Sequence, residues 1–157
     1  MCKSTHEGSW RELSAAELAS LDTTLRERGH RLTLQRQLVY ETILGCPGHI
    51  CAEHILAETG ARRPGLQMDK TTVYRTLDLL VELGLVREHR CGEGAAQYEP
   101  ATRDAHGHLL CSRCNTLYNL DEAVAAGIRA TLVETLGFAP DLDAYPLLGL
   151  CASCRAE

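Results

Sequence analysis

Four cysteines form two Cys-x-x-Cys pairs, Cys111 with Cys114 and Cys151 with Cys154, separated by the 36 residues 115–150. Two intervening residues let a tight turn aim both sulfurs at one point, and four thiolates match the tetrahedral preference of Zn²⁺. A single pair is also typical of a redox motif, whereas two copies favour a metal. The pattern predicts a structural zinc site, with a redox or disulfide function and reduced, metal-free cysteines as the alternatives.

Two histidines, His106 and His108, lie just before the first cysteine pair. In a strand their spacing places both imidazoles on one face and turns Cys111 to the other. Imidazoles combined with carboxylates are the ligand set of an exchangeable Fe²⁺, Mn²⁺ or Zn²⁺ site. We therefore expect a second metal site separate from the thiolates, with two surface histidines as the alternative.

Composition limits the class of protein. The chain has 157 residues, 45% of them hydrophobic but only 4% aromatic, so it can bury an aliphatic core in one domain or two small ones. Its first ten residues lack an apolar export segment, and no run approaches the roughly 18 apolar residues of a membrane span. We expect a soluble, cytoplasmic protein without membrane contact, in which eight cysteines indicate metal rather than disulfides.

Basic side chains are concentrated in two segments although the net charge is −5. Residues 26–40 and 61–75 hold half of the 16 lysines and arginines, whereas they contain only two acidic residues, Glu27 and Asp69. This distribution favours a nucleic-acid-binding surface, and two solvated helix faces are the alternative.

The N-terminal half has the pattern of a winged helix. Ser14 and Glu17 form a capping box, Thr33 and Asp69 can cap later helices, and glycines end three of the helices. After Gly84 the helical periodicity gives way to two short strands around a turn-rich tip. The expected helices cover 14–29, 33–45, 52–59 and 69–84, and the expected strands cover 85–90 and 95–99.

The C-terminal half has the pattern of a small α/β unit. We expect strands over 106–111 and 116–120, a helix over 121–136 and a last strand over 144–150, which Pro146 places at an edge or shortens at its start. The predicted fold class is α+β. Residues 1–99 form a winged-helix DNA-binding domain, 100–105 a hinge, and 106–157 a domain that carries the zinc.

Three motifs, in this order, resemble the ferric uptake regulator family of metal-sensing bacterial repressors. They are Arg31-Leu32-Thr33-Leu34-Gln35-Arg36, Thr71-Thr72-Val73-Tyr74-Arg75-Thr76-Leu77 and His106-Gly107-His108-Leu109-Leu110-Cys111-Ser112-Arg113-Cys114. The resemblance spans about 25–154 and closes on Cys151 and Cys154. It implies a metal-sensing site at His49, Glu99, His106 and His108, and a second domain that pairs two chains into a homodimer.

The resemblance also implies how DNA is bound. The helix over 69–83 would enter the major groove, with Val73 and Leu77 in the core. The side chains that would contact bases and phosphates are Lys70, Thr71, Thr72, Tyr74 and Arg75. Arg31 and Arg36 would add further contacts to the DNA. Two such helices fit a double-stranded operator with an AT-rich inverted repeat, and we expect repression of metal-uptake genes when metal is abundant.

The chain departs from the family pattern at three positions. Asn119 stands where the family often has an acidic ligand, which weakens assignment as a peroxide sensor. Ala126 and Asp143 stand where a third metal site would use a glutamate and a histidine, so we expect two metals per chain. Cys51, two residues after His49, is an alternative soft donor or a small buried cysteine.

Two other classes of function remain open from the sequence. His106, His108 and Glu99 could hold a catalytic zinc or iron, with Glu99 or Glu93 as the base. A zinc-stabilised module for protein interaction is the second alternative. DNA binding with a steep salt dependence separates both from a regulator, because that dependence comes from phosphate neutralisation.

Overall fold

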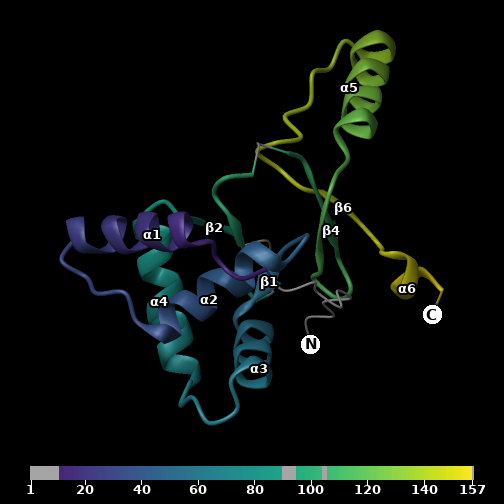
Figure 1. The fold of residues 1–157 in the computed structure, drawn as a ribbon. Helices are drawn as coiled ribbons and strands as arrows, with labels where there is room; N and C mark the ends of the chain where they lie inside the picture. The colour runs from purple at the N-terminus through teal and green to yellow at the C-terminus, as the bar shows by residue number, and fades with distance from the viewer. Residues whose placement is uncertain (1–10, 90–94, 104–105, 157) are drawn as a thin grey trace. The chain divides into compact units, whose positions relative to one another are not determined.

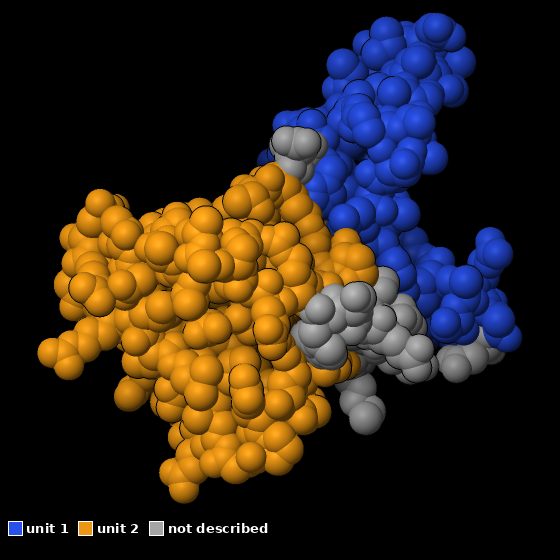
Figure 2. Space-filling view, viewed as in Figure 1, with its two compact units in different colours: residues 1–3, 91–94, 104–157 blue, residues 4–90, 95–103 orange. Residues whose placement is uncertain are grey.

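The computed structural model describes residues 11–89, 95–103 and 106–156, which belong to two compact units. The N-terminal unit contains residues 11–89 and 95–103, and the C-terminal unit contains residues 106–156 (Figures 1 and 2). Within the described segments, none of the helices combines the length and the apolar character that a bilayer crossing requires.

Four helices form most of the N-terminal unit: α1 (Ala15–Glu27), α2 (Leu34–Gly45), α3 (Ala52–Arg62) and α4 (Lys70–Glu82). The three caps predicted from the sequence are confirmed. Ser14 and Glu17 form the reciprocal capping box, and the side chains of Thr33 and Asp69 each accept a backbone N–H of the following helix. Each cap satisfies a donor that has no partner inside the helix. Helix α3 extends three residues beyond its expected end.

A three-stranded antiparallel sheet completes this unit. Its strands are β1 (Ile50–Cys51), β2 (Val86–His89) and β3 (Gln97–Pro100), in the order β1-β3-β2. Gly84 takes a positive φ of 68° at the end of α4, which turns the chain into β2. Strands β2 and β3 are the expected wing, whereas the two-residue strand β1 was not expected.

The core of the N-terminal unit is aliphatic, as the composition predicted. Leu25, Ile43, Ile55, Leu77 and Leu80 are fully buried where the helices meet each other and the sheet. Each such side chain stabilises the fold by about 1.5–3 kcal/mol relative to exposure. This core fixes the faces that α4 and the sheet present outward.

One buried ion pair connects several elements of the N-terminal unit. Glu41 of α2 is 2% exposed and lies 3.0 Å from the Arg62 guanidinium of α3. Its carboxylate also accepts the Leu13 backbone N–H at 3.3 Å and the Gln37 amide at 2.9 Å. A buried charge is tolerated when it is paired and hydrogen-bonded in this way.

The C-terminal unit is a second three-stranded sheet with two helices. The elements are β4 (His108–Cys111), β5 (Leu117–Asn119), α5 (Glu122–Leu136), β6 (Leu147–Gly149) and α6 (Ala152–Arg155). The strand order is β5-β4-β6, with β4 antiparallel to β5 and parallel to β6. Strand β6 begins after Pro146 at the sheet edge, as expected, and β4 begins two residues later than predicted. The short helix α6 was not expected.

The core of the C-terminal unit is small. Its buried cluster consists of Leu120, Ala125 and Leu142, with Ile128 and Leu147 partly buried against it. Most apolar side chains of α5 are exposed instead, including Val124 and Leu136. A unit with so little buried surface requires further stabilisation, such as a metal or a partner chain.

Candidate metal centres and nucleic-acid interface

The four cysteines of the two predicted pairs come together in the C-terminal unit. All four Sγ atoms lie within 4.8 Å of one another, and those of Cys114 and Cys151 are 3.9 Å apart. A tetrahedral zinc with Zn–S bonds of about 2.3 Å separates its sulfurs by roughly 3.8 Å. A disulfide needs about 2.05 Å, and all four residues are free thiols. This thiol cluster fits one zinc ion and argues against the disulfide alternative.

Local structure explains how each pair is shaped. Asn115 takes a left-handed φ of 56°, and its N–H donates to the Cys111 carbonyl at 2.8 Å, which closes the first turn. Cys151 precedes α6 and Cys154 lies within it. Parallel pairing of β4 with β6 sets Cys111 beside Gly149, so the two pairs meet at the ends of neighbouring strands.

The thiols of the cluster differ in acidity. The backbone N–H of Cys151 is the main cause that lowers the pKa of Cys111 to about 6. The pKa of Cys151 is lowered by the backbone N–H of Cys154 and by the Tyr118 hydroxyl. Burial and the neighbouring thiols raise the pKa of Cys154 to about 12. The cluster is therefore partly ionised at neutral pH, and a cation would replace the proton of Cys154.

Glu99 is the centre of the second group of ligands. It lies in the central strand β3 and is 1% exposed. Pairing of β1 with β3 sets Ile50 opposite Tyr98, so His49, one residue before β1, falls beside Glu99. Strand β1 thus positions His49 beside Glu99. A strand of two residues has no recognisable periodicity, so the sequence did not predict it.

Three side chains form this Glu99 cluster: His49, His89 and Glu99. The Glu99 Oε1 atom lies 3.0 Å from His89 Nε2, and Oε2 lies 3.7 Å from His49 Nε2. The two imidazoles meet edge to face with their centroids 5.0 Å apart. Two imidazole nitrogens and a carboxylate within 4.8 Å of one another match the donors of a divalent transition metal.

His89 was missed by the sequence analysis. Strand β2 was expected, but its register with β3 was not, and only that register decides which side chain meets Glu99. Arg87 pairs directly with Glu99, which makes His89 its diagonal neighbour on the same face. Alternation along 86–89 was the only available signal, and it does not identify the register with β3.

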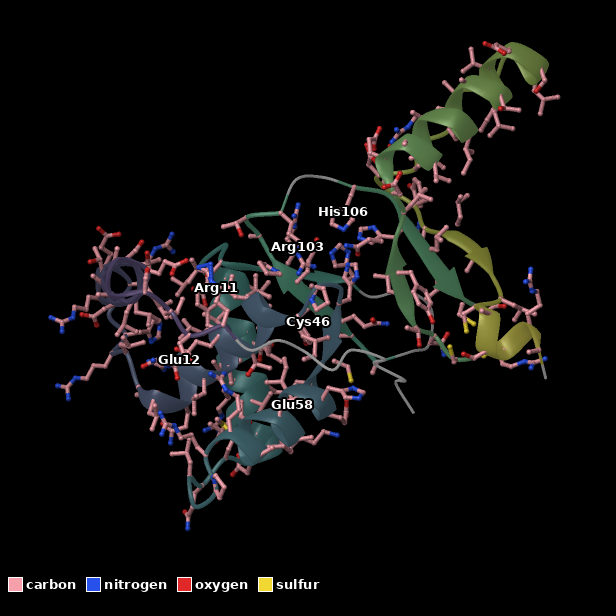
Figure 3. All side chains as sticks on the ribbon, turned by 45° about the vertical axis from the view of Figure 1, so that its right-hand side comes forward. Arg11, Glu12, Cys46, Glu58, Arg103 and His106 are labelled. Atoms are coloured by element: carbon pink, nitrogen blue, oxygen red, sulfur yellow. The ribbon has the colours of Figure 1, made fainter. Side chains whose placement is uncertain are left out.

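Two arginines also surround Glu99. Arg87 Nε lies 3.1 Å from Oε1 as an ion pair without hydrogen-bond alignment, and Arg103 Nη1 lies 3.8 Å from Oε2. Arg103 donates to the carbonyls of Cys46 and Gly48, the latter at 2.6 Å. It thereby holds the loop that leads into His49. Figure 3 labels Arg103 and Cys46.

His106 and His108 lie together in the C-terminal unit, although only His108 belongs to β4. Their ring centroids are 4.7 Å apart, with a tilt of 53° between the planes (Figure 3 labels His106). His108 is 8% exposed and pairs with Asn119 on β5. The structure thus sets the amide that replaces the family's usual acidic residue directly opposite one of the predicted ligands.

Two other residues considered as ligands have different surroundings. Cys51 is fully buried at the start of α3, with its Sγ 3.2 Å from His54 Nδ1. The Asp143 carboxylate pairs with the Arg129 guanidinium at 2.8 Å. Among the described residues, groups suited to a metal occur only at the thiol cluster and around Glu99.

Helix α4 presents the predicted DNA-contacting side chains on its outer face. Lys70, Thr71 and Arg75 are exposed, and Thr72 and Tyr74 are half-buried. Val73 and Leu77 are fully buried, which confirms that they belong to the core. Lys70 lies 3.1 Å from Glu53 and 5.7 Å from the centre of the Tyr74 ring. Arg75 is therefore open to a polyanion, Lys70 would exchange Glu53 for a phosphate, and the apolar stripe anchors the helix.

The other two predicted DNA contacts lie just before and within α2. Arg31 is exposed, and Arg36 is half-buried with its guanidinium donating to the Arg31 carbonyl. This contact links the two arginines at the N-terminus of α2, where backbone N–H groups favour anions.

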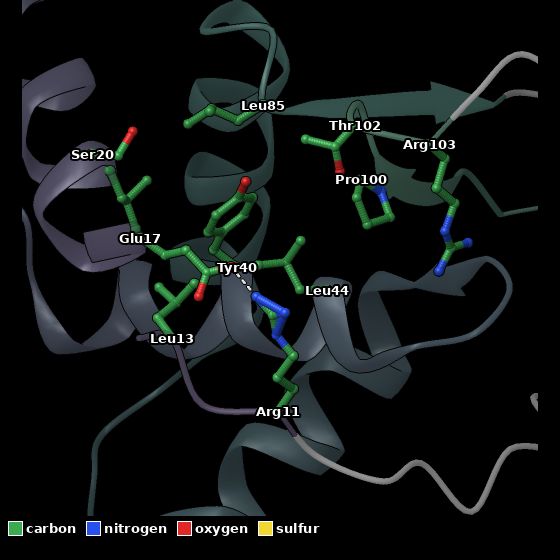
Figure 4. A pocket seen from close by; sticks show the side chains of 11 residues that line it. Arg11, Leu13, Glu17, Ser20, Tyr40, Leu44, Leu85, Pro100, Thr102 and Arg103 are labelled. Carbon is green, nitrogen blue, oxygen red and sulfur yellow. Dashed lines mark hydrogen bonds and ion pairs between the residues drawn. The ribbon is translucent and has the colours of Figure 1, made fainter. Parts of the chain in front are cut away.

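A pocket of about 580 Å³ lies elsewhere in the N-terminal unit (Figure 4). Apolar side chains such as Tyr40 and Leu44 form much of its wall, and its one carboxylate, Glu17, contacts Arg11. The lining contains neither histidine nor cysteine, and none of the residues named for the enzyme alternative belongs to it.

Comparison with known proteins gives consistent matches. Residues 27–141 match the profile of the Ferric uptake regulator family. The ferric uptake regulation protein of Campylobacter jejuni is 28% identical over 133 residues, covering 85% of each chain. The peroxide operon regulator of Bacillus subtilis is 26% identical over 145 residues, covering 92% of this chain and 98% of that protein.

A solved structure, that of the Helicobacter pylori ferric uptake regulator, has a similar fold. It aligns with a TM-score of 0.68 at 19% identity and covers 92% of this chain and 97% of that one. The expected α+β architecture, a winged helix-turn-helix followed by a small α/β unit, is confirmed by this likeness and by the elements described above.

Proposed function

The chain belongs to the ferric uptake regulator family, as its motifs predicted, and from this premise we propose that it represses transcription when a divalent metal fills its sensing site. Members of this family are metal-responsive, DNA-binding transcription regulators and not enzymes, which decides against the catalytic alternative. The sensed metal, the operator and the dimer belong to the proposal.

Two metals have separate tasks in this proposal. The thiol cluster holds a structural zinc that stabilises the C-terminal unit, whose buried core is small. The sensing metal, Fe²⁺, Zn²⁺ or Mn²⁺, binds to His49, Glu99, His106 and His108, to which we add His89. Imidazole and carboxylate donors accept all three ions, and their availability in the cell selects among them.

The sensing ligands come from both units, and this provides the switch. His49, His89 and Glu99 belong to the N-terminal unit, whereas His106 and His108 belong to the C-terminal unit. We place the hinge at residues 100–105, between domains 1–99 and 106–157. When ligands come from two units, metal binding favours the arrangement of the units in which all of the ligands reach the ion. The metal can shift the equilibrium between arrangements only by as much as its affinities for them differ.

Helix α4 is the proposed recognition helix. Arg75 and Lys70 can reach phosphates or a guanine edge, and the Tyr74 ring can contact thymine methyl groups. Thr71 and Thr72 lie in the first turn of the helix, where a phosphate is also favoured by backbone N–H groups. Arg31 and Arg36 add contacts from the start of α2. The target is a double-stranded, AT-rich inverted repeat.

A homodimer follows from the apolar surface of the C-terminal unit. Of the large hydrophobic side chains that are exposed in the described segments, all but Leu34 lie in this unit. Leu136, Phe138, Tyr145 and Leu148 are each more than 60% exposed. A second copy would bury this surface, and its two-fold symmetry would present two α4 helices to an inverted repeat.

The observation that carries the proposal is that one winged unit holds both the Glu99 cluster and a helix with a basic outer face. The test is operator binding by gel shift or fluorescence anisotropy, with the protein loaded with metal, chelated, or carrying His106→Ala and His108→Ala. We expect chelation and the double substitution each to weaken binding by at least tenfold. Equal affinity in all three states would refute metal control.

A matched control separates loss of sensing from loss of folding. His54→Ala removes an imidazole that is outside the proposed ligand set, although it lies near Cys51. This variant should keep its dependence on metal. The zinc content of the sensing variants should stay at about one ion per chain, because the thiol cluster is untouched.

A further inference from the structure

Glu99 is surrounded by basic side chains within its own unit before any metal is considered. Its two oxygens face two imidazoles and two guanidinium groups, all between 3.0 and 3.8 Å away. We propose that Arg87 competes with the sensed metal for the Glu99 carboxylate and thereby raises the metal concentration at which the site fills. This inference rests on the proposed sensing function of Glu99.

Arg87 is placed to compete by the register of the wing. It lies directly opposite Glu99 across the β2–β3 ladder, and its Nε is 3.1 Å from Oε1. The same oxygen lies 3.0 Å from His89 Nε2. A carboxylate oxygen that coordinates a divalent ion cannot keep a guanidinium as close neighbour without repulsion between the two cations. Filling the site therefore favours a conformation in which Arg87 has moved away from Oε1.

Arg87 also has somewhere to go. Its side chain is 36% exposed, whereas Glu99 is 1% exposed. Its guanidinium also donates to the Arg103 carbonyl, so leaving Glu99 breaks this bond as well. A long arginine side chain can then rotate its charged end into water while its aliphatic part stays in place. Water also screens part of the repulsion, so the expected effect is a moderate change of affinity rather than a block.

Arg103 has a different task although it faces the same carboxylate. It lies 3.8 Å from Oε2, and its two Nη atoms donate to the carbonyls of Cys46 and Gly48. These bonds hold the loop that positions His49. Arg103 is therefore a positioning residue, and its removal should weaken metal binding, the opposite of the effect expected for Arg87.

The test measures Co²⁺ binding to the full-length protein with zinc retained in the thiol cluster. Co²⁺ is followed by its visible absorption, and affinity is obtained by competition with a chelator. Arg87→Gln should bind Co²⁺ about tenfold more tightly than the natural chain does. A tenfold change of affinity lies within the usual range of coupling between two sites. Arg103→Gln should bind it more weakly.

Two controls make the result specific. Arg87→Lys keeps the positive charge and should retain the natural affinity within about threefold. Arg28→Gln removes one positive charge from an exposed site after α1 and should leave affinity unchanged. Thermal unfolding of the metal-free Arg87→Gln protein gives a second readout, and it should occur at lower temperature because Glu99 loses a counter-ion.

The outcomes separate the inference from the proposed function. Suppose that the natural chain binds one Co²⁺ through Glu99 and that Arg87→Gln binds it with equal or weaker affinity. This result would refute the competition by Arg87 and leave the proposed sensing site standing. A natural chain whose Co²⁺ binding is unaffected by Glu99→Gln would refute the sensing site and this inference with it. Lower stability without tighter binding would mean that Arg87 only supports the fold.

Discussion

The four thiols of the zinc cluster are chemically unequal because their hydrogen-bond donors differ. Backbone N–H groups lower the pKa of Cys111 and Cys151, whereas burial raises that of Cys154. Side chains that look equivalent in the sequence thus enter zinc binding from different protonation states. The difference in acidity arises because the fold places backbone N–H groups beside the sulfurs of Cys111 and Cys151 and buries that of Cys154.

Zinc affinity should depend on pH in a way that follows from these values. With its pKa at about 12, Cys154 keeps its proton at neutral pH and must release it to bind zinc. We expect the apparent affinity to rise at least tenfold per pH unit between pH 6.5 and 8.5, because at least the Cys154 proton is released, and more steeply below about 6, where Cys111 is also protonated.

The measurement is competition between the protein and a chelator for Zn²⁺ at several pH values, corrected for the protonation of the chelator. Cys154→Ser should lose tight zinc binding, whereas Cys46→Ser, which changes a thiol outside the cluster, should retain it. An affinity that does not change with pH would contradict proton release from Cys154.

At the scale of elements, α4 combines an anchored face with an exposed basic face. Val73 and Leu77 fix the helix in the core, and the Asp69 cap fixes where it begins. The side chains that reach DNA therefore project from a rigid support. The sequence periodicity predicted this division because buried and exposed positions alternate at the helical spacing.

Arg75 gives a test of this helix. Arg75→Ala removes one exposed positive charge, so the affinity for operator DNA should fall by about tenfold or more at low salt. The slope of log affinity against log salt concentration should decrease by about 1, because one phosphate or guanine contact is lost.

Fluorescence anisotropy at several salt concentrations checks this prediction, with Arg155→Ala as a control that loses the same exposed charge outside both basic segments. Circular dichroism and thermal unfolding should remain unchanged for Arg75→Ala, since the side chain is exposed. An unchanged salt slope would exclude Arg75 from the DNA contact.

At the scale of the whole molecule, the distribution of apolar surface differs sharply between the two units. The N-terminal unit buries its aliphatic side chains in a large core, whereas the C-terminal unit exposes Leu136, Phe138 and Leu148. This difference is the physical reason to expect that the C-terminal unit pairs with a second copy.

Charged substitutions on that surface should separate the copies. Phe138→Glu combined with Leu148→Glu should convert a dimer to a monomer in analytical ultracentrifugation, because two carboxylates per chain would be buried without partners. Affinity for a two-site operator should fall by at least 100-fold, while half-site binding persists. Leu34→Glu places the same charge on an exposed leucine of the other unit and should leave the dimer intact. A dimer that survives the double substitution would locate the interface elsewhere.

Much of the fold was predictable because its signals are local. The helix caps at Ser14, Thr33 and Asp69 and the apolar spacing of α4 depend on residues within one or two turns. The Cys-x-x-Cys pairs carry their chemistry in their own spacing. The position of β1 was not predictable, since two residues give no periodicity, and the same applies to the four-residue helix α6.

The sequence alone determined the ligand types, the thiol pairs, the capped helices and the basic face of α4, because each depends on neighbours along the chain. Only the tertiary structure decided that Glu99 lies between His49 and Arg87, with His89 diagonal to it, because strand register joins segments up to 50 residues apart. Register depends on packing and backbone pairing across the whole sheet, and the residues of one strand cannot specify it.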